Sequence, residues 1–137
     1  TGESAAAEYC QAGCLVPASL EKINHILRDT RTDETLAIDV GLLDLLHSLA
    51  RTIAAAEPFH VISGYRSPST NAYLREHGGG GVAVNSLHLV GKAIDIRVPG
   101  VGLRALYRTA VGLRGGGVGN YPSSDFVHVD VGRVRTW

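Results

Sequence analysis

The chain has 137 residues, of which 45% are hydrophobic and 19% charged, and its 13 basic residues balance its 13 acidic residues. This composition excludes an intrinsically disordered chain, and the length is typical of one domain with its own core, which we expect over residues 1–137. A formal net charge of zero argues against a nucleic-acid partner, and no apolar run reaches the roughly 20 residues that span a bilayer.

The first segment, residues 1–16, mixes small and polar residues and is expected to form a loose strand or hairpin. Cys10 and Cys14 lie within it at a C-x-x-x-C spacing, which matches no zinc ribbon and no thioredoxin motif. A disulfide that closes this short loop and a pair of half-buried thiols both fit the spacing, so the pairing stays open.

Two helices are expected next. Apolar residues recur at helical spacing over residues 18–27, with Ser19 as the expected N-cap. A second apolar helical face extends over residues 39–56, with Asp39 as the expected N-cap and Pro58 beyond its end.

The middle of the chain predicts a short strand and a third helix. Residues 59–62 are apolar and end at a Ser-Gly pair, which is typical of a strand followed by a turn. Residues 69–76 are expected to form a helix capped by Ser69 or Thr70. The glycine run at residues 78–81 cannot hold regular structure and is expected to be a loop.

The last third alternates strands with one helix. Residues 92–98 and 126–131 alternate apolar and polar side chains, as half-buried strands do, and residues 102–113 form an amphipathic helical pattern. Because helices come first and strands later, we predict an α+β fold with a small antiparallel sheet on which the helices pack.

Polar side chains of the two late strands are expected to share one surface. Asp95 points away from the apolar side of its strand, and His128 and Asp130 point away from the apolar side of theirs. His88 precedes Asp95 by seven residues, and Gly91 allows a sharp turn between them. If the strands are neighbours, His88, Asp95 and His128 can meet.

Two imidazoles and one carboxylate are a known ligand set for catalytic zinc, with the remaining position left to water. The spacing by itself is not specific, because a buried histidine bonded to an aspartate produces the same pattern. From the residues alone, a zinc site and a structural His–Asp pair are both open.

The wider motif is more specific. The string from Ser86 to Asp95 matches S-x-H-x-x-G-x-A-x-D and resembles the signature of the D-Ala-D-Ala carboxypeptidase and murein endopeptidase group of zinc peptidases, which share a fold with the Hedgehog signalling domain. The segment Ser63-Gly-Tyr-Arg-Ser-Pro68 with Asn71 resembles the arginine-bearing segment of that group. Residues 116–122, 126–130 and 133–137 resemble its exported bacterial branch, so the resemblance covers most of the chain.

The resemblance implies His88, Asp95 and His128 as ligands of a zinc ion. It also implies that Arg66 binds a substrate carboxylate or the oxyanion, a task that suits a planar and permanently charged donor. A structural ion pair is the alternative for Arg66. Ser86 either hydrogen-bonds in the site or caps a turn, and Tyr65 joins Arg66 and Ser86 as a candidate substrate-binding residue.

The general base has two candidates. The group carries an acid three residues before the second histidine ligand, and Asp125 has that position here. Asp130 is the rival, because it shares a strand face with His128. Asp125 can face inward only if residues 123–125 form a loop, which Pro122 and two serines favour. The motif favours Asp125, and the other aspartate is then expected to orient a ligand histidine.

The expected function is hydrolysis of peptidoglycan cross-links or stem peptides by a zinc metallopeptidase. A D-Ala-type carboxypeptidase and a non-catalytic zinc-containing binding module of Hedgehog-like fold are the alternatives. Since peptidoglycan lies outside the cytoplasmic membrane, we expect a periplasmic or otherwise extracytoplasmic protein whose export signal has been removed. A monomer is expected.

Overall fold

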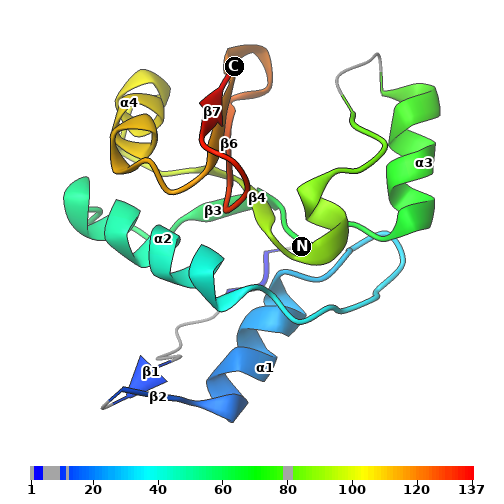
Figure 1. Cartoon of the computed structure of the whole chain (residues 1–137), viewed down its shortest axis with the longest axis horizontal. Helices are drawn as coiled ribbons and strands as arrows, with labels where there is room; N and C mark the ends of the chain where they lie inside the picture. Colours follow the sequence, from blue (N-terminus) through cyan, green and yellow to red (C-terminus); the bar gives the residue numbers. More distant parts are fainter. Residues whose placement is uncertain (1, 5–9, 12, 79–81) are drawn as a thin grey trace.

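A computed structural model describes residues 2–4, 10–11, 13–78 and 82–137 of the chain (Figure 1). Its helices are α1 (Pro17–Ile26), α2 (Val40–Thr52), α3 (Pro68–His77) and α4 (Leu103–Leu113), with 3-10 turns η1 (Leu87–Val90) and η2 (Pro122–Ser124). Its strands are β1 (Cys10–Gln11), β2 (Cys14–Leu15), β3 (His60–Ser63), β4 (Ala93–Arg97), β5 (Gly117–Tyr121), β6 (Phe126–Asp130) and β7 (Arg135–Thr136).

Helix starts follow proline where the sequence offers it. Helix α1 begins at Pro17 with Val16 as N-cap, ahead of the predicted Ser19, because the fixed φ of proline suits the first helical position. For the same reason α3 begins at Pro68, and its N-cap is Ser67 rather than Ser69 or Thr70. The Ser67 hydroxyl accepts a hydrogen bond from the Thr70 N–H.

Helix α2 confirms its predicted cap but is shorter than expected. The Asp39 carboxylate accepts the Gly41 N–H at 2.7 Å, which is the expected N-cap bond. The helix ends at Thr52 rather than near residue 56, since Ala54 adopts a positive φ of 50° that no helix can continue through.

The main sheet has the strand order β3-β4-β6-β5-β7 and confirms the α+β prediction. All its pairs are antiparallel except β5–β7, which is parallel and departs from the predicted purely antiparallel sheet. Strand β5 was not predicted, because its glycines resemble a helix end. Glycine is required at position 119 of this strand, because a Cβ there would lie 2.5 Å from the Trp137 indole.

One face of this sheet forms the hydrophobic core. Helices α2 and α4 lie on that side of β4 and β6, whereas η1 and α3 lie on the other side (Figure 1). The inward side chains of the two central strands pack with Leu42, Leu49 and Leu106 of these helices. Because a strand alternates, burying this face forces the polar side chains of β4 and β6 onto the opposite one. The strand residues of the core are Ile94, Ile96, Val127 and Val129.

The N-terminal segment confirms the predicted hairpin in part, since β1 and β2 pair antiparallel with Gln11 opposite Cys14. The disulfide question for Cys10 and Cys14 concerns side chains outside those that the structure describes. Within the described residues, no helix is long and apolar enough to cross a membrane.

Candidate metal centre

Asp95 and His128 lie directly opposite each other in the sheet. Strands β4 and β6 are antiparallel with Asp95 paired to His128, and both side chains leave the sheet on the face away from the core. Both residues are buried, at 5% and 9% relative exposure. The alternation in the sequence thus indicated the correct face, and the register places the two side chains side by side.

His88 reaches the same point from the turn η1. The Ser86 hydroxyl caps this turn by accepting the His88 N–H at 3.2 Å, and Gly91 ends it in the left-handed conformation with a φ of 69°. A side chain on Gly91 would also meet the Ala37 carbonyl oxygen at 2.7 Å. The turn therefore requires glycine at this position.

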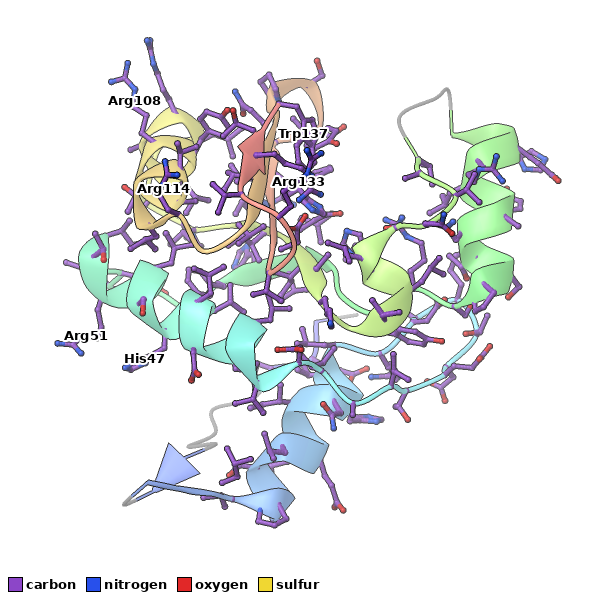
Figure 2. The ribbon with its side chains drawn as sticks, in the orientation of Figure 1. His47, Arg51, Arg108, Arg114, Arg133 and Trp137 are labelled. Atoms are coloured by element: carbon purple, nitrogen blue, oxygen red, sulfur yellow. The ribbon has the colours of Figure 1, made fainter. Side chains whose placement is uncertain are left out.

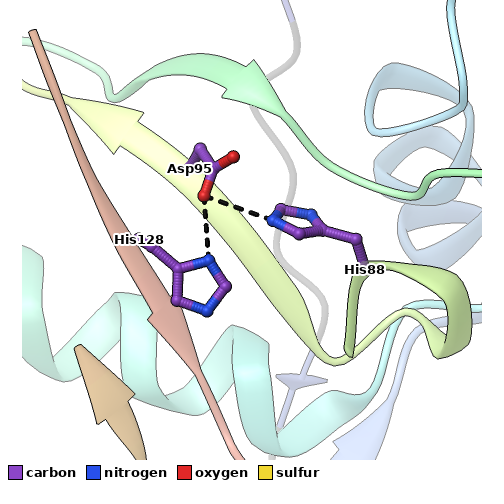
Figure 3. A group of neighbouring side chains, drawn as sticks. All are labelled: His88, Asp95 and His128. Atoms are coloured by element: carbon purple, nitrogen blue, oxygen red, sulfur yellow. Dashed lines mark hydrogen bonds and ion pairs between the residues drawn. The ribbon is translucent and has the colours of Figure 1, made fainter. Parts of the chain in front are cut away.

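The three side chains converge on one point (Figure 3). The Asp95 Oδ1 atom lies 3.2 Å from His88 Nε2 and 3.0 Å from His128 Nδ1. One ligand atom from each residue lies within 4.8 Å of the other two. Two nitrogens and an oxygen at this spacing form a potential metal site.

The outward nitrogens of the two rings are both hydrogen-bonded to acceptors. His88 Nδ1 lies 2.8 Å from the Gly64 carbonyl oxygen, and His128 Nε2 lies 2.7 Å from the Asp130 carboxylate. Carbonyl and carboxylate oxygens only accept, so each outward nitrogen is the N–H of its ring. In the neutral rings, the inward nitrogens then point their lone pairs at the carboxylate of Asp95. Because lone pairs and a carboxylate repel each other, this arrangement requires a cation or an added proton between the rings and Asp95.

The donor set and its spacing fit zinc. Zinc ligands at about 2.0–2.1 Å in tetrahedral geometry lie about 3.3 Å from one another, close to the two separations at Asp95. Outer hydrogen bonds from ligand histidines to a carbonyl and a carboxylate are the usual support of such sites. The residues present therefore fit a His₂Asp zinc centre.

Two carboxylates, Asp95 and Asp130, contact the histidines of the site. Burial opposes ionisation of Asp95, but when the two rings carry the added proton, hydrogen bonds from His128 and His88 outweigh burial and lower the pKa of this carboxyl to about 2. Burial likewise disfavours a charged His128, yet the carboxylates of Asp130 and Asp95 raise the pKa of its ring. Two carboxylates around the histidines favour a cation at this position.

Asp130 is fully buried behind His128, and both of its oxygens are occupied. Oδ1 accepts the Gly117 and Gly132 N–H groups and one Arg135 nitrogen, at 2.8, 2.9 and 3.1 Å. Oδ2 accepts the other Arg135 nitrogen at 2.9 Å and the His128 ring at 2.7 Å. Despite burial, these bonds lower the pKa of Asp130 well below its usual range. The geometry suits an orienter of His128.

Asp125 lies at the rim. It follows η2 in the left-handed conformation with a φ of 55°, so the loop that its inward orientation required is present. Its side chain is 68% exposed and lies 3.3 Å from Arg97, and Asp125 does not line the cavity at the metal cluster. The adjacent Ser124 does line that cavity.

Arg66 lies beside the cluster. It lines a cavity of about 320 Å³ together with the three candidate ligands. Its backbone N–H bonds to the His88 carbonyl, and Asn71 Oδ1 accepts from its guanidinium at 3.2 Å. Burial lowers the pKa of Arg66, against the opposing effect of Asp95, although an arginine stays charged in proteins. Asn71, quoted in the arginine-bearing motif, is thus a support for this side chain.

The two other candidate substrate-binding residues, Tyr65 and Ser86, differ in whether they line the cavity. Tyr65 is 8% exposed and belongs to the core, so it packs beneath the site and does not line the cavity. Ser86 lines the cavity and also caps η1, so both of its alternative roles fit. A larger hollow of about 500 Å³ lies beside α4, away from the cluster, and includes Arg104 and Arg108.

The sequence motifs predicted no role for the aromatic residues of the cavity or for Arg135. Tyr121, Phe126 and Trp137 line it, and Arg135 does so as well. The C-terminal R-x-R-x-W string contains Arg135 and Trp137 and was the sequence signal for both. Only the position of β7 in the sheet brings these two side chains to the site.

Comparisons with known proteins find relatives over the whole length of the chain. The family model described as peptidoglycan L,D-endopeptidase MepK matches residues 1–137. The chain is 42% identical over 137 residues to the peptidoglycan L,D-endopeptidase MepK of Escherichia coli K12, covering all of this chain and 75% of that protein. It is 44% identical over 138 residues to a Haemophilus influenzae protein named "Probable peptidoglycan L,D-endopeptidase MepK", covering 100% of this chain and 74% of that one.

Proposed function

The chain belongs to the family of peptidoglycan L,D-endopeptidases of the MepK type, and we propose that it cleaves an L,D-peptide bond of peptidoglycan at a zinc ion bound by His88, Asp95 and His128. It is a metallopeptidase that hydrolyses peptidoglycan, and its substrate implies extracytoplasmic action. The observation that carries the metal proposal is the convergence of two ring lone pairs on one carboxylate oxygen.

The proposed ligand atoms are His88 Nε2, Asp95 Oδ1 and His128 Nδ1. A zinc ion in such a site lowers the pKa of bound water to about 7 and polarises a carbonyl group. His88 is held for this task by Gly64, and His128 by Asp130, so neither ring needs to rotate to bind a cation.

We propose Asp125 as the general base and Asp130 as the residue that orients His128. The Asp130 oxygens accept from Gly117, Gly132, Arg135 and His128, which leaves no free lone pair to take a proton from water. The Asp125 carboxylate is exposed and bonded only weakly, at 3.3 Å, to Arg97, so a side-chain rotation can bring it over the cavity beside Ser124.

The site supports catalysis better than a purely structural metal. The ligands line an open cavity together with Arg66, whereas structural zinc sites are closed by four protein ligands. A carboxypeptidase is the second candidate, because Arg66 could bind a terminal carboxylate. The family membership supports an endopeptidase, in which Arg66 binds an internal carboxylate of the stem peptide or the oxyanion.

Arg66→Lys is predicted to lower turnover roughly tenfold to a thousandfold, about what loss of one oxyanion donor costs. Lysine keeps the charge but lacks the planar fork that makes two parallel hydrogen bonds. We expect zinc content and the melting temperature to stay unchanged. Arg51→Lys, on the exposed side of α2 (Figure 2), is the matched control. Wild-type turnover in Arg66→Lys would assign Arg66 a structural role.

The direct test of the proposed function is digestion of purified peptidoglycan, followed by mass spectrometry of the released fragments. We expect cross-linked dimers to be converted to monomers by the zinc-loaded protein, no cleavage after chelation, and recovery when zinc is added back. Release of a single terminal amino acid would favour the carboxypeptidase. Zinc binding without any cleavage would favour the binding module.

We further propose that residues 1–137 form one catalytic domain that acts as a monomer in the periplasm or an equivalent compartment. The three proposed ligands, Arg66 and Asp130 all line one cavity of this chain. One cluster of buried residues includes side chains of the loop after α1, of α2, of α4 and of the sheet, which supports a single folding unit.

A further inference from the structure

Trp137 lies against the proposed zinc site. Its ring centroid is 5.1 Å from that of His128, and its indole Nε1 donates to the Tyr121 hydroxyl at 2.7 Å. Figure 2 shows Trp137 beside β7, away from Arg108 on α4 and from Arg114 at the end of that helix. The residue is 45% exposed and lines the same cavity as the proposed ligands.

The fold holds this indole in place from several sides. The Trp137 backbone pairs with β5, donating to the Val118 carbonyl at 3.1 Å and accepting from the Asn120 N–H at 2.9 Å. Gly119 lies under the ring, because a Cβ there would be 2.5 Å from the indole. The Arg135 guanidinium lies 4.9 Å from the ring centroid. These contacts fix the orientation of the ring before any substrate arrives.

The accessible part of Trp137 is apolar. The single polar atom of the indole is already bonded to Tyr121, so the remaining exposed surface offers hydrocarbon contact alone. Tyr121 is in turn stacked on Phe126, with ring centroids 4.7 Å apart. Trp137, Tyr121 and Phe126 together make an aromatic wall on one side of the cavity.

Sheet order separates Trp137 from Arg66. Arg66 follows β3, and Trp137 follows β7, while the strands that carry Asp95 and His128 lie between them in the order β3-β4-β6-β5-β7. A peptide bond above the metal site therefore has Arg66 on one side and the Trp137 ring on the other, where the nearby Arg135 is already paired with Asp130. The cavity is asymmetric in a way that can orient a peptide.

We propose that Trp137 is a substrate-binding residue that determines specificity. Its indole packs on the methylene side chain of one residue of the peptide. That residue and the group bound by Arg66 lie on opposite sides of the scissile bond. The inference rests on the proposed endopeptidase function and adds a subsite to it. A chain of methylenes matches an apolar indole surface whose polar atom is already bonded to Tyr121, because burying methylenes against it removes them from water.

The test compares two synthetic stem peptides that differ only at this residue, one with a four-carbon side chain and one with a methyl group. In the wild type we expect KM for the long-chain peptide to be roughly 10- to 100-fold lower, the discrimination that a few methylenes provide in an apolar pocket. In Trp137→Ala we expect the two KM values to become similar. Trp137→Phe keeps part of the preference. Tyr73→Ala, an exposed aromatic outside the cavity, is the matched control.

Fluorescence gives a second readout, because Trp137 is the only tryptophan of the chain. We expect its emission to shift on addition of the long-chain peptide and to change less with the methyl peptide. If Trp137→Ala weakens both peptides equally, or if wild-type emission does not respond to peptide that binds, the inference is overturned. If peptide shifts the emission but is never cleaved, the proposed function fails, while the difference between the two peptides still decides the role of Trp137.

Discussion

Replacing His88 or His128 by alanine is expected to abolish stoichiometric zinc and with it peptidoglycan hydrolysis. Each change removes one of three proposed ligand atoms and leaves two, too few for a stable catalytic site. The loss of turnover should exceed the roughly 10- to 100-fold that loss of an outer partner of a ligand costs. Metal content per protein, measured by mass spectrometry of the purified variants, is the first readout, and fragment release from peptidoglycan is the second.

The matched control is His47→Ala. His47 is exposed on α2 and points away from the sheet (Figure 2), so its loss tests for general effects of removing a histidine. We expect normal zinc and normal turnover in this variant. Asp95→Ala should behave like the two ligand variants. Full zinc occupancy in His88→Ala or His128→Ala would refute the proposed ligand set.

Asp125→Asn and Asp130→Asn are expected to inactivate the enzyme in different ways. Removal of a general base costs about 10²- to 10⁴-fold in turnover, and Asp125→Asn should show that loss with its zinc retained. Asp130→Asn should weaken zinc affinity by roughly 10- to 100-fold, because an amide no longer fixes the N–H of His128 with a charged acceptor. Turnover at saturating zinc is then the decisive measurement.

Excess zinc should restore much of the activity of Asp130→Asn and none of that of Asp125→Asn. Glu57→Gln, an exposed carboxylate outside the cavity, serves as the control for charge loss. Thermal unfolding of Asp130→Asn checks that the buried network with Arg135 still folds. If Asp130→Asn instead keeps its zinc and cannot be rescued, while Asp125→Asn is active, Asp130 is the base and our assignment is reversed.

Periodicity along the chain was sufficient to predict most of the elements and the fold class. Apolar spacing indicated α1, α2 and α4, and the alternation in β4 and β6 indicated which of their side chains leave the core. These predictions succeed because burying one face of a helix or strand is a local requirement that each segment meets by itself. Strands β5 and β7 were not predicted from the sequence. A glycine-rich strand and a two-residue strand have little periodicity of their own, and they form because neighbouring strands pair with them.

The candidate ligands were also named from the sequence, but on the strength of a motif rather than of spacing. Only the tertiary structure placed Asp95 opposite His128 and brought in His88 through the turn that Gly91 permits. A separation of 33 residues between Asp95 and His128 has no local signature, because the contact depends on which strands become neighbours.

The two aspartates and Trp137 show the same limit. Sequence put Asp130 on the face of His128, yet the five hydrogen bonds that occupy its oxygens come from β5, β6, β7 and the segment after β6. Tyr65 was a candidate substrate-binding residue from the motif, but it packs in the core. Trp137 had no predicted role, because only the pairing of β7 with β5 brings it to the cavity. The sequence alone determined the fold class and the residue types of the chemistry. The tertiary structure decided which side chains point into the cavity, since that depends on contacts between segments far apart in the chain.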